Sequence, residues 1–160
     1  MYRWGHIGAA LFVYAPVAAA LIHAGEPLLM AVGGIVAVGC ATLPDADESL
    51  PIDHRGPTHT VWFVSGGALV FAAIGGLLGA SVGRSVVFAA TAGGAAFLSF
   101  GSHLLADSIT PMGIRPFYPL SKWHHSFDVT PAANPRANTT MLGLGVLFFV
   151  VCLAVVVGGF

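Results

Sequence analysis

The sequence predicts an all-α membrane protein, a single integral domain over residues 1–160 that forms a bundle of about five transmembrane helices. Three observations carry this prediction. Hydrophobic residues make up 56% of the chain and charged residues only 8%, whereas a soluble domain carries about 25% charge. Five apolar stretches approach the length of about 20 residues that a helix needs to cross a bilayer. Seven histidines outnumber the six lysines and arginines, and the polar residues gather between these stretches.

The five stretches cover residues of about 7–22, 27–43, 60–83, 85–106 and 140–160. Arg3 precedes the first stretch and small residues end it, a pattern that is also typical of a signal peptide. Cleavage there would leave the second stretch starting almost at once, so we expect a retained helix. The second stretch opens with Pro27, which a first helical turn tolerates. Thr58 is the expected N-cap of the third.

The third and fourth stretches are rich in glycine, and Gly75, Gly79 and Gly83 recur at intervals of four residues. Small residues at this spacing let transmembrane helices approach closely. Close packing inside the bundle is the favoured interpretation, and a homo-oligomer formed through these two helices is the alternative. Cys40 and Cys152 each stand alone in an apolar run, so the sequence offers neither a disulfide framework nor a cysteine-type zinc site.

Long polar connections follow the second and fourth stretches, at 44–59 and 107–139, and tight turns follow the first and third. A cytoplasmic N-terminus places five of the six basic residues on the cytoplasmic side: Arg3, Arg55, Arg115, Lys122 and Arg136. The positive-inside rule therefore favours a multi-pass protein of the inner or plasma membrane, with its N-terminus cytoplasmic and its C-terminus outside. A formal net charge of −1 argues against nucleic-acid binding by a basic surface.

The alternation of helix direction also brings most of the histidines to the cytoplasmic face. Six of the seven fall there: His6, His54, His59, His103, His124 and His125. Asp45, Asp47 and Asp107 fall on the same face, because they follow helices that end on it. His23 is the exception, since it lies at the short outer turn.

Two pairs of residues in this group have spacings suited to a metal ion. His103 and Asp107 are four apart on a helix, so both side chains lie on one face and could reach one ion. The alternative is a hydrogen bond that caps the helix end. Asp45 and Asp47 flank a single residue, so in an extended segment their carboxylates would face one point and repel unless a cation lay between them. The alternative is a solvated acidic loop.

Together, Asp45, His59, His103 and Asp107 supply two imidazoles and two carboxylates, a set that suits zinc, manganese or iron. We expect their ligand atoms to converge within about 5 Å. His6 is a further expected ligand, and with it a second ion is conceivable, since two ions can clamp the attacking and leaving oxygens of a phosphoryl displacement. The expected cofactor is a divalent transition metal, with zinc favoured, as one or two ions.

The remaining polar residues suggest roles around such an ion. Asp47 and Arg55 are the candidate catalytic residues, Asp47 as a base or a ligand of a second ion and Arg55 as a bidentate fork for an anionic group. The candidates for substrate binding are Arg55, Arg115, Lys122, His124 and His125. A membrane lipid is the expected partner, because a substrate would reach this site at the bilayer surface.

Three blocks of sequence occur together: LPDADE at 43–48, HRGPTH at 54–59 and HLLADSITPMGIRPFYPLS at 103–121. Over residues of about 6–121 the chain resembles the YdjM-like family of membrane-bound, metal-dependent hydrolases. It is more distantly similar to the superfamily of zinc-dependent phospholipases C and single-strand nucleases, which are helical and build a cluster from an early His, an Asp with a later His, and a helical HxxxD.

The distant similarity implies that Asp45, His59, His103 and Asp107 hold one ion, and that Asp107 bridges to another with the help of His6. Members of that superfamily also use an HxxxE pair, which this chain lacks, so a third ion is not expected. The resemblance assigns Asp47 no role. The function it implies is that of a metal-dependent hydrolase, with a phosphoester of a lipid or amphiphile as the favoured substrate.

Three other functions stay open. GPTH at 56–59 faintly resembles the PSGH block of metal-free lipid phosphatases with a histidine nucleophile, but their upstream Lys and Arg-Pro block is missing and carboxylates around the site would repel phosphate. A metal or proton transporter would need ionisable groups at the bilayer midplane, where this sequence has almost none. The last alternative is a purely structural membrane protein whose polar residues cap the bundle.

Overall fold

The computed structural model describes residues 1–159, and five long helices account for most of them. They are α1 (Arg3–His23), α2 (Pro27–Cys40), α3 (Val61–Ala80), α4 (Ser85–Ser108) and α5 (Pro135–Gly158), with the short 3-10 helices η1 (Pro44–Ser49) and η2 (Pro57–His59) between α2 and α3. The described residues contain no strand beyond a single antiparallel bridge between Ile114 and His125. All five helices, with α2 extended through η1, are long and apolar enough to cross a membrane. The all-α membrane fold is therefore confirmed.

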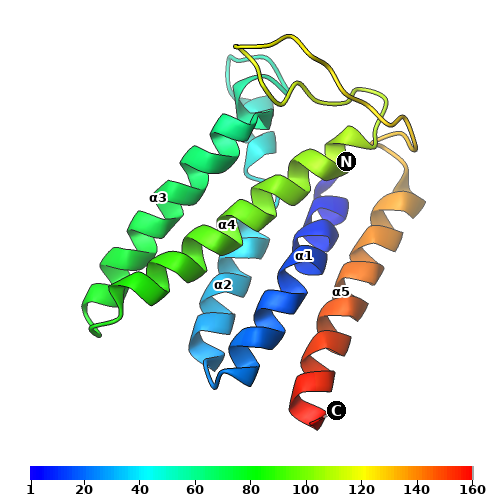
Figure 1. Cartoon of the computed structure of the whole chain (residues 1–160). Helices are drawn as coiled ribbons and strands as arrows, with labels where there is room; N and C mark the ends of the chain where they lie inside the picture. The colour runs from blue at the N-terminus through cyan, green and yellow to red at the C-terminus, as the bar shows by residue number, and fades with distance from the viewer. Residues whose placement is uncertain (160) are drawn as a thin grey trace.

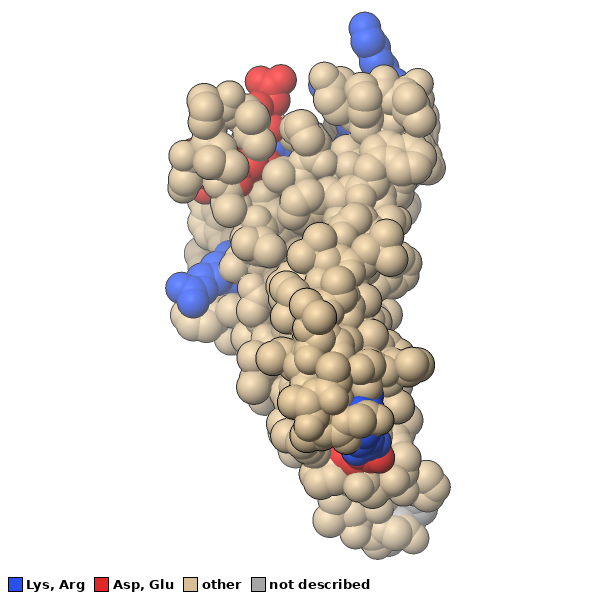
Figure 2. Space-filling view, turned by 90° about the vertical axis from the view of Figure 1, so that its left-hand side faces the viewer, with Lys and Arg blue, Asp and Glu red and all other residues tan. Residues whose placement is uncertain are grey.

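The helices stand side by side, with the two long connections at one end and the short turns at the other (Figure 1). The N-terminus lies at the end with the long connections, which we call the polar end, and the C-terminus lies at the opposite end. On the face that Figure 2 shows, the long lower part of the molecule is uncharged apart from one adjoining blue and red pair. Arg84 and Glu26 form an ion pair at the end opposite the polar end, where hydrogen bonds of 3.0 and 2.5 Å join the α3–α4 turn to the α1–α2 turn.

Close helix packing positions the polar end. Helix α1 packs against α2, α4 and α5, and α3 packs against α4. Gly75 and Gly79 lie so near α4 and its N-cap that a Cβ at either position would collide with the backbone there. These glycines therefore serve the close packing that was expected inside the bundle. A homo-oligomer through α3 and α4 stays a prediction.

Several helix boundaries differ from the expected ones, which rested on apolar length. Helix α1 begins at Arg3, about one turn before the expected start. Helix α5 begins at Pro135, about five residues early, because the Asn134 side chain accepts hydrogen bonds from two amides of its first turn. The N-cap of α3 is Thr60, whose side chain accepts from an amide of the first turn, so the assignment of Thr58 as the cap was wrong.

Candidate metal centre

Two histidines and two aspartates meet at the polar end of the bundle, and we call this group the metal-type centre. His103 and Asp107 lie near the end of α4, His59 ends η2, and Asp45 belongs to η1. Nε2 of His59 is 3.1 Å from Nε2 of His103, and it is 3.4 Å from Oδ1 of Asp45 and 3.2 Å from Oδ2 of Asp107. Nε2 of His103 is 3.3 Å from the same oxygen of Asp45 and 3.6 Å from that of Asp107. The expected convergence of these four side chains is confirmed.

The spacing of these four atoms matches the size of a tetrahedral zinc site. Zinc binds imidazole nitrogen and carboxylate oxygen at about 2.0–2.2 Å, so tetrahedral ligand atoms stand about 3.3–3.6 Å apart. The five distances above run from 3.1 to 3.6 Å. The side chains of His59 and His103 are fully buried, while 23% of the Asp45 side chain is exposed. This buried His and Asp group could therefore hold a metal ion with very little movement.

The carboxylate of Asp107 has an oxygen that nothing in the described protein satisfies. Oδ2 of Asp107 is buried and lacks a hydrogen-bond partner, although a buried carboxylate oxygen without a partner is costly in free energy. The neighbours of this oxygen are the Nε2 atoms of His59 and His103. A cation placed among the four ligand atoms would satisfy this oxygen, so the residues present fit a divalent metal ion.

Hydrogen bonds on the far side of each ring fix the nitrogen that faces this centre. Nδ1 of His103 lies 2.8 Å from the carbonyl oxygen of Ala41, so Nδ1 carries the proton and Nε2 presents its lone pair. Nδ1 of His59 lies 2.9 Å from Oγ1 of Thr58, and that hydroxyl donates to Oδ2 of Asp47 at 2.5 Å. Both rings are therefore held in the tautomer that a metal ligand requires.

His6 lies beside this group and faces the other oxygen of each carboxylate. Its ring stacks on that of His103 with 3.7 Å between centroids. Its Nε2 is 3.5 Å from Oδ1 of Asp107 and 3.7 Å from Oδ2 of Asp45. The Met1 amino group also contacts Oδ1 of Asp107. One ligand atom from each of His6, Asp45, His103 and Asp107 lies within 4.8 Å of the others. Nε2 of His6 also lies 2.8 Å from the carbonyl oxygen of Met1, to which it can only donate, so His6 is less free to act as a ligand than the other three residues.

Asp47 faces away from this centre, because its segment folds as the 3-10 helix η1 and not as the extended segment that was expected. Its buried carboxylate accepts from Nδ1 of His54 at 2.8 Å and from the amide of Arg55 at 3.1 Å, in addition to Thr58. Its contact with the centre is through Nδ1 of His59, at 3.4 Å. Asp47 therefore organises the loop at 54–58 and reaches the centre only through the far side of the His59 ring.

Arg55 joins the two long connections. Its Nη1 donates to Oγ1 of Thr110 at 2.9 Å and to the carbonyl oxygen of Gly113 at 3.0 Å, and its Nη2 donates to Oδ1 of Asp107 at 2.9 Å. Only 8% of the side chain is exposed. Because Nη1 and Nη2 are engaged with the protein, the guanidinium holds Asp107 in place. The buried Nε, which has no partner in the described protein, is the one nitrogen still uncommitted.

Arg115 and His124 border a small polar hollow beside Arg55. The hollow has a volume of about 140 Å³ and is also lined by His54. Nε2 of His124 donates to the carbonyl oxygen of Met112 at 2.8 Å, which fixes its ring at the rim. The cationic or titratable side chains that line this hollow are therefore those of His54, Arg55, Arg115 and His124. The hollow is large enough for a single anionic group.

The other expected residues lie farther from the centre. Lys122 is exposed. The ring of His125 stacks on Trp123 and meets the edge of Phe127, so it belongs to an aromatic surface and not to the polar hollow. His23 lies in the last turn of α1, at the end of the bundle away from the metal-type centre, as expected.

Several groups that hold the centre together were missed from the sequence. The carbonyl oxygens of Ala41 and Gly113 orient His103 and Arg55, and backbone carbonyls have no sequence signature. The hydroxyls of Thr58 and Thr110 had one weak signal, since each lies within three residues of an expected ligand. Neither hydroxyl carries a charge or titrates near neutral pH, so neither stood out as a residue of the site.

No curated protein and no solved structure matches the chain. A family model described as YdjM inner membrane protein matches it over residues 1–160. The match extends beyond the sequence blocks that first suggested it and covers every helix of the bundle. The chain therefore belongs to the YdjM inner membrane protein family.

Proposed function

We propose that this protein is a membrane-embedded metal-dependent hydrolase, and that it acts on a phosphoester of a lipid or amphiphile at the cytoplasmic interface. The observation that carries the proposal is the set of four ligand atoms at the spacing of a tetrahedral site, with the buried oxygen of Asp107 lacking any other partner. Zinc is the favoured ion, since two imidazoles and two carboxylates suit it.

The site residues have different proposed roles. Asp45, His59, His103 and Asp107 would hold one ion, and His6 would be the further ligand if a second ion were bound. A bound divalent ion supplies Lewis acidity and lowers the pKa of water. In this proposal Arg55 is a positioning residue for Asp107. The contacts of Asp47 favour a positioning role through Thr58 and His59 over the role of catalytic base.

A phosphoester is the favoured substrate because of the charges beside the centre. Arg115, His124 and His54 border the polar hollow next to Arg55, and cationic groups of this kind bind phosphate oxygens. Lys122 is a further candidate for the headgroup, since it is exposed in the same connection. The hollow lies at the polar end of a transmembrane bundle, which favours a membrane lipid over a soluble phosphoester.

The activity is tested with protein purified in detergent, loaded with zinc and given lipids with phosphomonoester and phosphodiester headgroups. We expect hydrolysis of at least one class, its loss on treatment with a chelator and its return when zinc is added back. Metal-loaded protein that hydrolyses none of these lipids would contradict the proposal. If such protein carried zinc across a sealed vesicle membrane, the transporter alternative would replace it.

The orientation of the bundle gives a separate prediction. Five of the six basic residues lie at the polar end or in its connections, so this end should be cytoplasmic. On a background without Cys40 and Cys152, Ser49→Cys should react with a membrane-impermeant thiol reagent only after the cells are opened. Ala24→Cys, in the turn at the opposite end, should react in intact cells. The reverse pattern would place the candidate site outside the cytoplasm.

Metal binding should weaken as the pH falls, because protons compete for the same nitrogens. Burial lowers the pKa of His59, but the neighbouring carboxylates of Asp107 and Asp45 outweigh burial, so without metal the pKa of this ring is raised above its ordinary value. Below this raised pKa the ion must displace a proton, so the Kd for zinc should increase about tenfold per pH unit for each proton displaced. Calorimetry in buffers of different ionisation enthalpy measures that release. A Kd that is constant between about pH 6 and pH 8 would contradict coordination by His59.

A further inference from the structure

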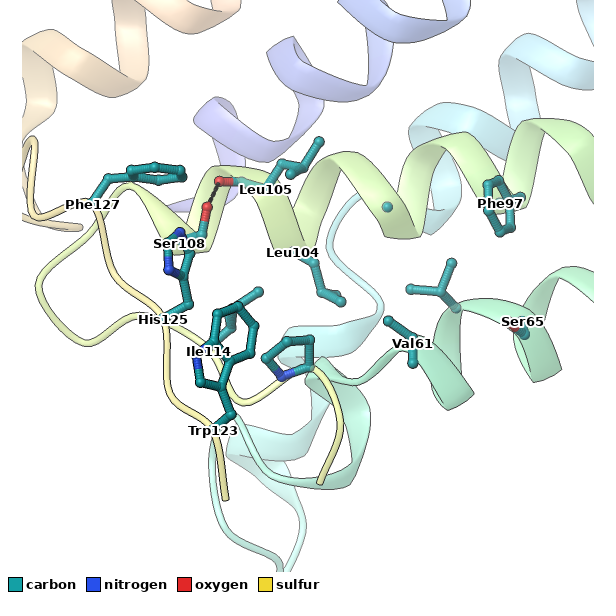
Figure 3. Close-up of a pocket in the computed structure, with 13 residues that line it drawn as sticks. Val61, Ser65, Phe97, Leu104, Leu105, Ser108, Ile114, Trp123, His125 and Phe127 are labelled. Atoms are coloured by element: carbon teal, nitrogen blue, oxygen red, sulfur yellow. Dashed lines mark hydrogen bonds between the residues drawn. The ribbon is translucent and has the colours of Figure 1, made fainter. Parts of the chain in front are cut away.

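An apolar groove runs between α3 and α4 on the outside of the bundle (Figure 3). Near the polar end it has a volume of about 510 Å³, with Val61 of α3 and Leu104 of α4 in its walls. Trp123 lies over the end of this part of the groove (Figure 3). Phe97 and Leu105 border it and are 52% and 65% exposed, so the groove opens sideways, toward the hydrocarbon of the bilayer.

The groove continues toward the other face of the membrane. A second hollow of about 500 Å³ lies between the same two helices and shares Ser65 and Phe97 with the first. Small residues such as Gly94 and Ala89 line it. From Ala89 to Ser108, α4 rises about 28 Å at 1.5 Å per residue, whereas one leaflet contributes about 15 Å of hydrocarbon. The groove is therefore long enough for an acyl chain of ordinary membrane lipids.

We propose that this groove holds an acyl chain of the substrate, and that the phosphate of the same lipid lies in the polar hollow beside Arg55 and Arg115. The proposal rests on the proposed function and adds a position for each end of the substrate. Ile114 lines both the groove and the polar hollow, so the two sites share a wall. On α4, His103 and Asp107 face the metal-type centre, while the next residue after each, Leu104 and Ser108, lines the groove.

The form of the groove favours a lipid chain over a helix from a second copy of the protein. The residues that line its two parts include no Asp, Glu, Lys or Arg. Segment 123–127 covers the polar end of the groove with Trp123, His125 and Phe127. A transmembrane helix would have to continue past that cover, because it extends beyond the hydrocarbon core. A lipid chain meets no such obstacle, since it ends at its own headgroup.

The groove can be filled at two glycines without disturbing the bundle. A Cβ added at Gly94 or Gly101 meets no atom within 4 Å, and both residues line the groove. Gly94→Leu and Gly101→Leu should therefore fold, since leucine is also the better helix former. Gly66→Leu and Gly143→Leu are matched controls, because a Cβ there also meets no atom within 4 Å and neither residue lines the groove.

The test uses full-length protein in phosphatidylcholine vesicles that contain phosphatidic acid with a photoreactive acyl chain. We expect light to attach the lipid to peptides of α3 and α4. Gly94→Leu and Gly101→Leu should lower this labelling at least about fivefold, because an overfilled groove excludes the chain, and the two control variants should label like the wild-type protein. Hydrolysis of a short-chain, water-soluble phosphoester is measured on the same samples.

The two measurements separate this inference from the proposed function. Labelling does not require turnover, so groove-specific labelling of a protein that hydrolyses nothing would support the groove and remove the hydrolase proposal. Hydrolysis together with equal labelling of all four glycine variants would overturn the groove and keep the hydrolase. Labelling of the lipid on helices other than α3 and α4 would also overturn it.

Discussion

Replacing His103 with alanine should remove both the bound metal and the hydrolytic activity. His103 is fully buried, its Nδ1 is committed to the carbonyl oxygen of Ala41, and its Nε2 lies within 3.6 Å of both candidate carboxylates. We expect metal content to fall below about 0.1 ion per chain and the rate to fall on the order of a thousandfold. Elemental analysis and the lipid hydrolysis assay measure the two effects.

The matched control for this change is His23→Ala, which removes a histidine from the opposite end of the same bundle. It should leave metal content and activity unchanged. Asp107→Asn should behave like His103→Ala, because it replaces the carboxylate with a neutral amide that has a single oxygen to offer a metal ion. Full metal content and full activity in His103→Ala would mean that the pair on α4 only caps a helix.

Replacing Asp47 with asparagine should weaken metal binding although Asp47 does not face the metal-type centre. Its carboxylate accepts from Thr58, which in turn accepts from Nδ1 of His59. Loss of a partner behind a metal-ligating histidine typically lowers metal affinity about 10–100-fold. The Kd for zinc, measured by competition with a chelator, should rise by that factor, and activity should recover when zinc is in excess.

Asp53→Asn is the control for this prediction, since Asp53 is an exposed acid in the same connection. Two other outcomes would assign Asp47 a different role. Metal content reduced by about half at saturating zinc would make Asp47 a ligand of a second ion. An unchanged Kd together with a large loss of rate would make it the catalytic base.

Much of the site could be predicted because the direction of each helix determines on which face of the membrane its two ends lie. Each apolar stretch reverses the direction of the chain, so residues at the start of one helix and at the end of the next fall on the same face of the membrane. That argument brought His6, Asp45, His59, His103 and Asp107 together without any knowledge of packing. It could not say which atoms face one another, because this depends on side-chain rotamers and on hydrogen bonds behind each ring.

Other features lay beyond the sequence for physical reasons. The alternating acids Asp45 and Asp47 suggested an extended segment, but after Pro44 the chain forms a 3-10 helix and the two carboxylates diverge. The early start of α5 depends on the N-cap at Asn134, which a hydropathy pattern does not detect. The apolar groove depends on how α3 and α4 are placed relative to each other, so no single stretch of sequence encodes it.

The metal content of the wild-type protein decides whether the centre described above is a metal site. Protein purified in detergent without chelators, then dialysed against buffer that contains zinc and afterwards against zinc-free buffer, is analysed by elemental mass spectrometry together with the His103→Ala variant. We predict about one or two divalent transition-metal ions per wild-type chain and almost none in the variant. A folded wild-type protein that retains no ion, or retains as much as His103→Ala does, would contradict the proposed metal centre and the function built on it.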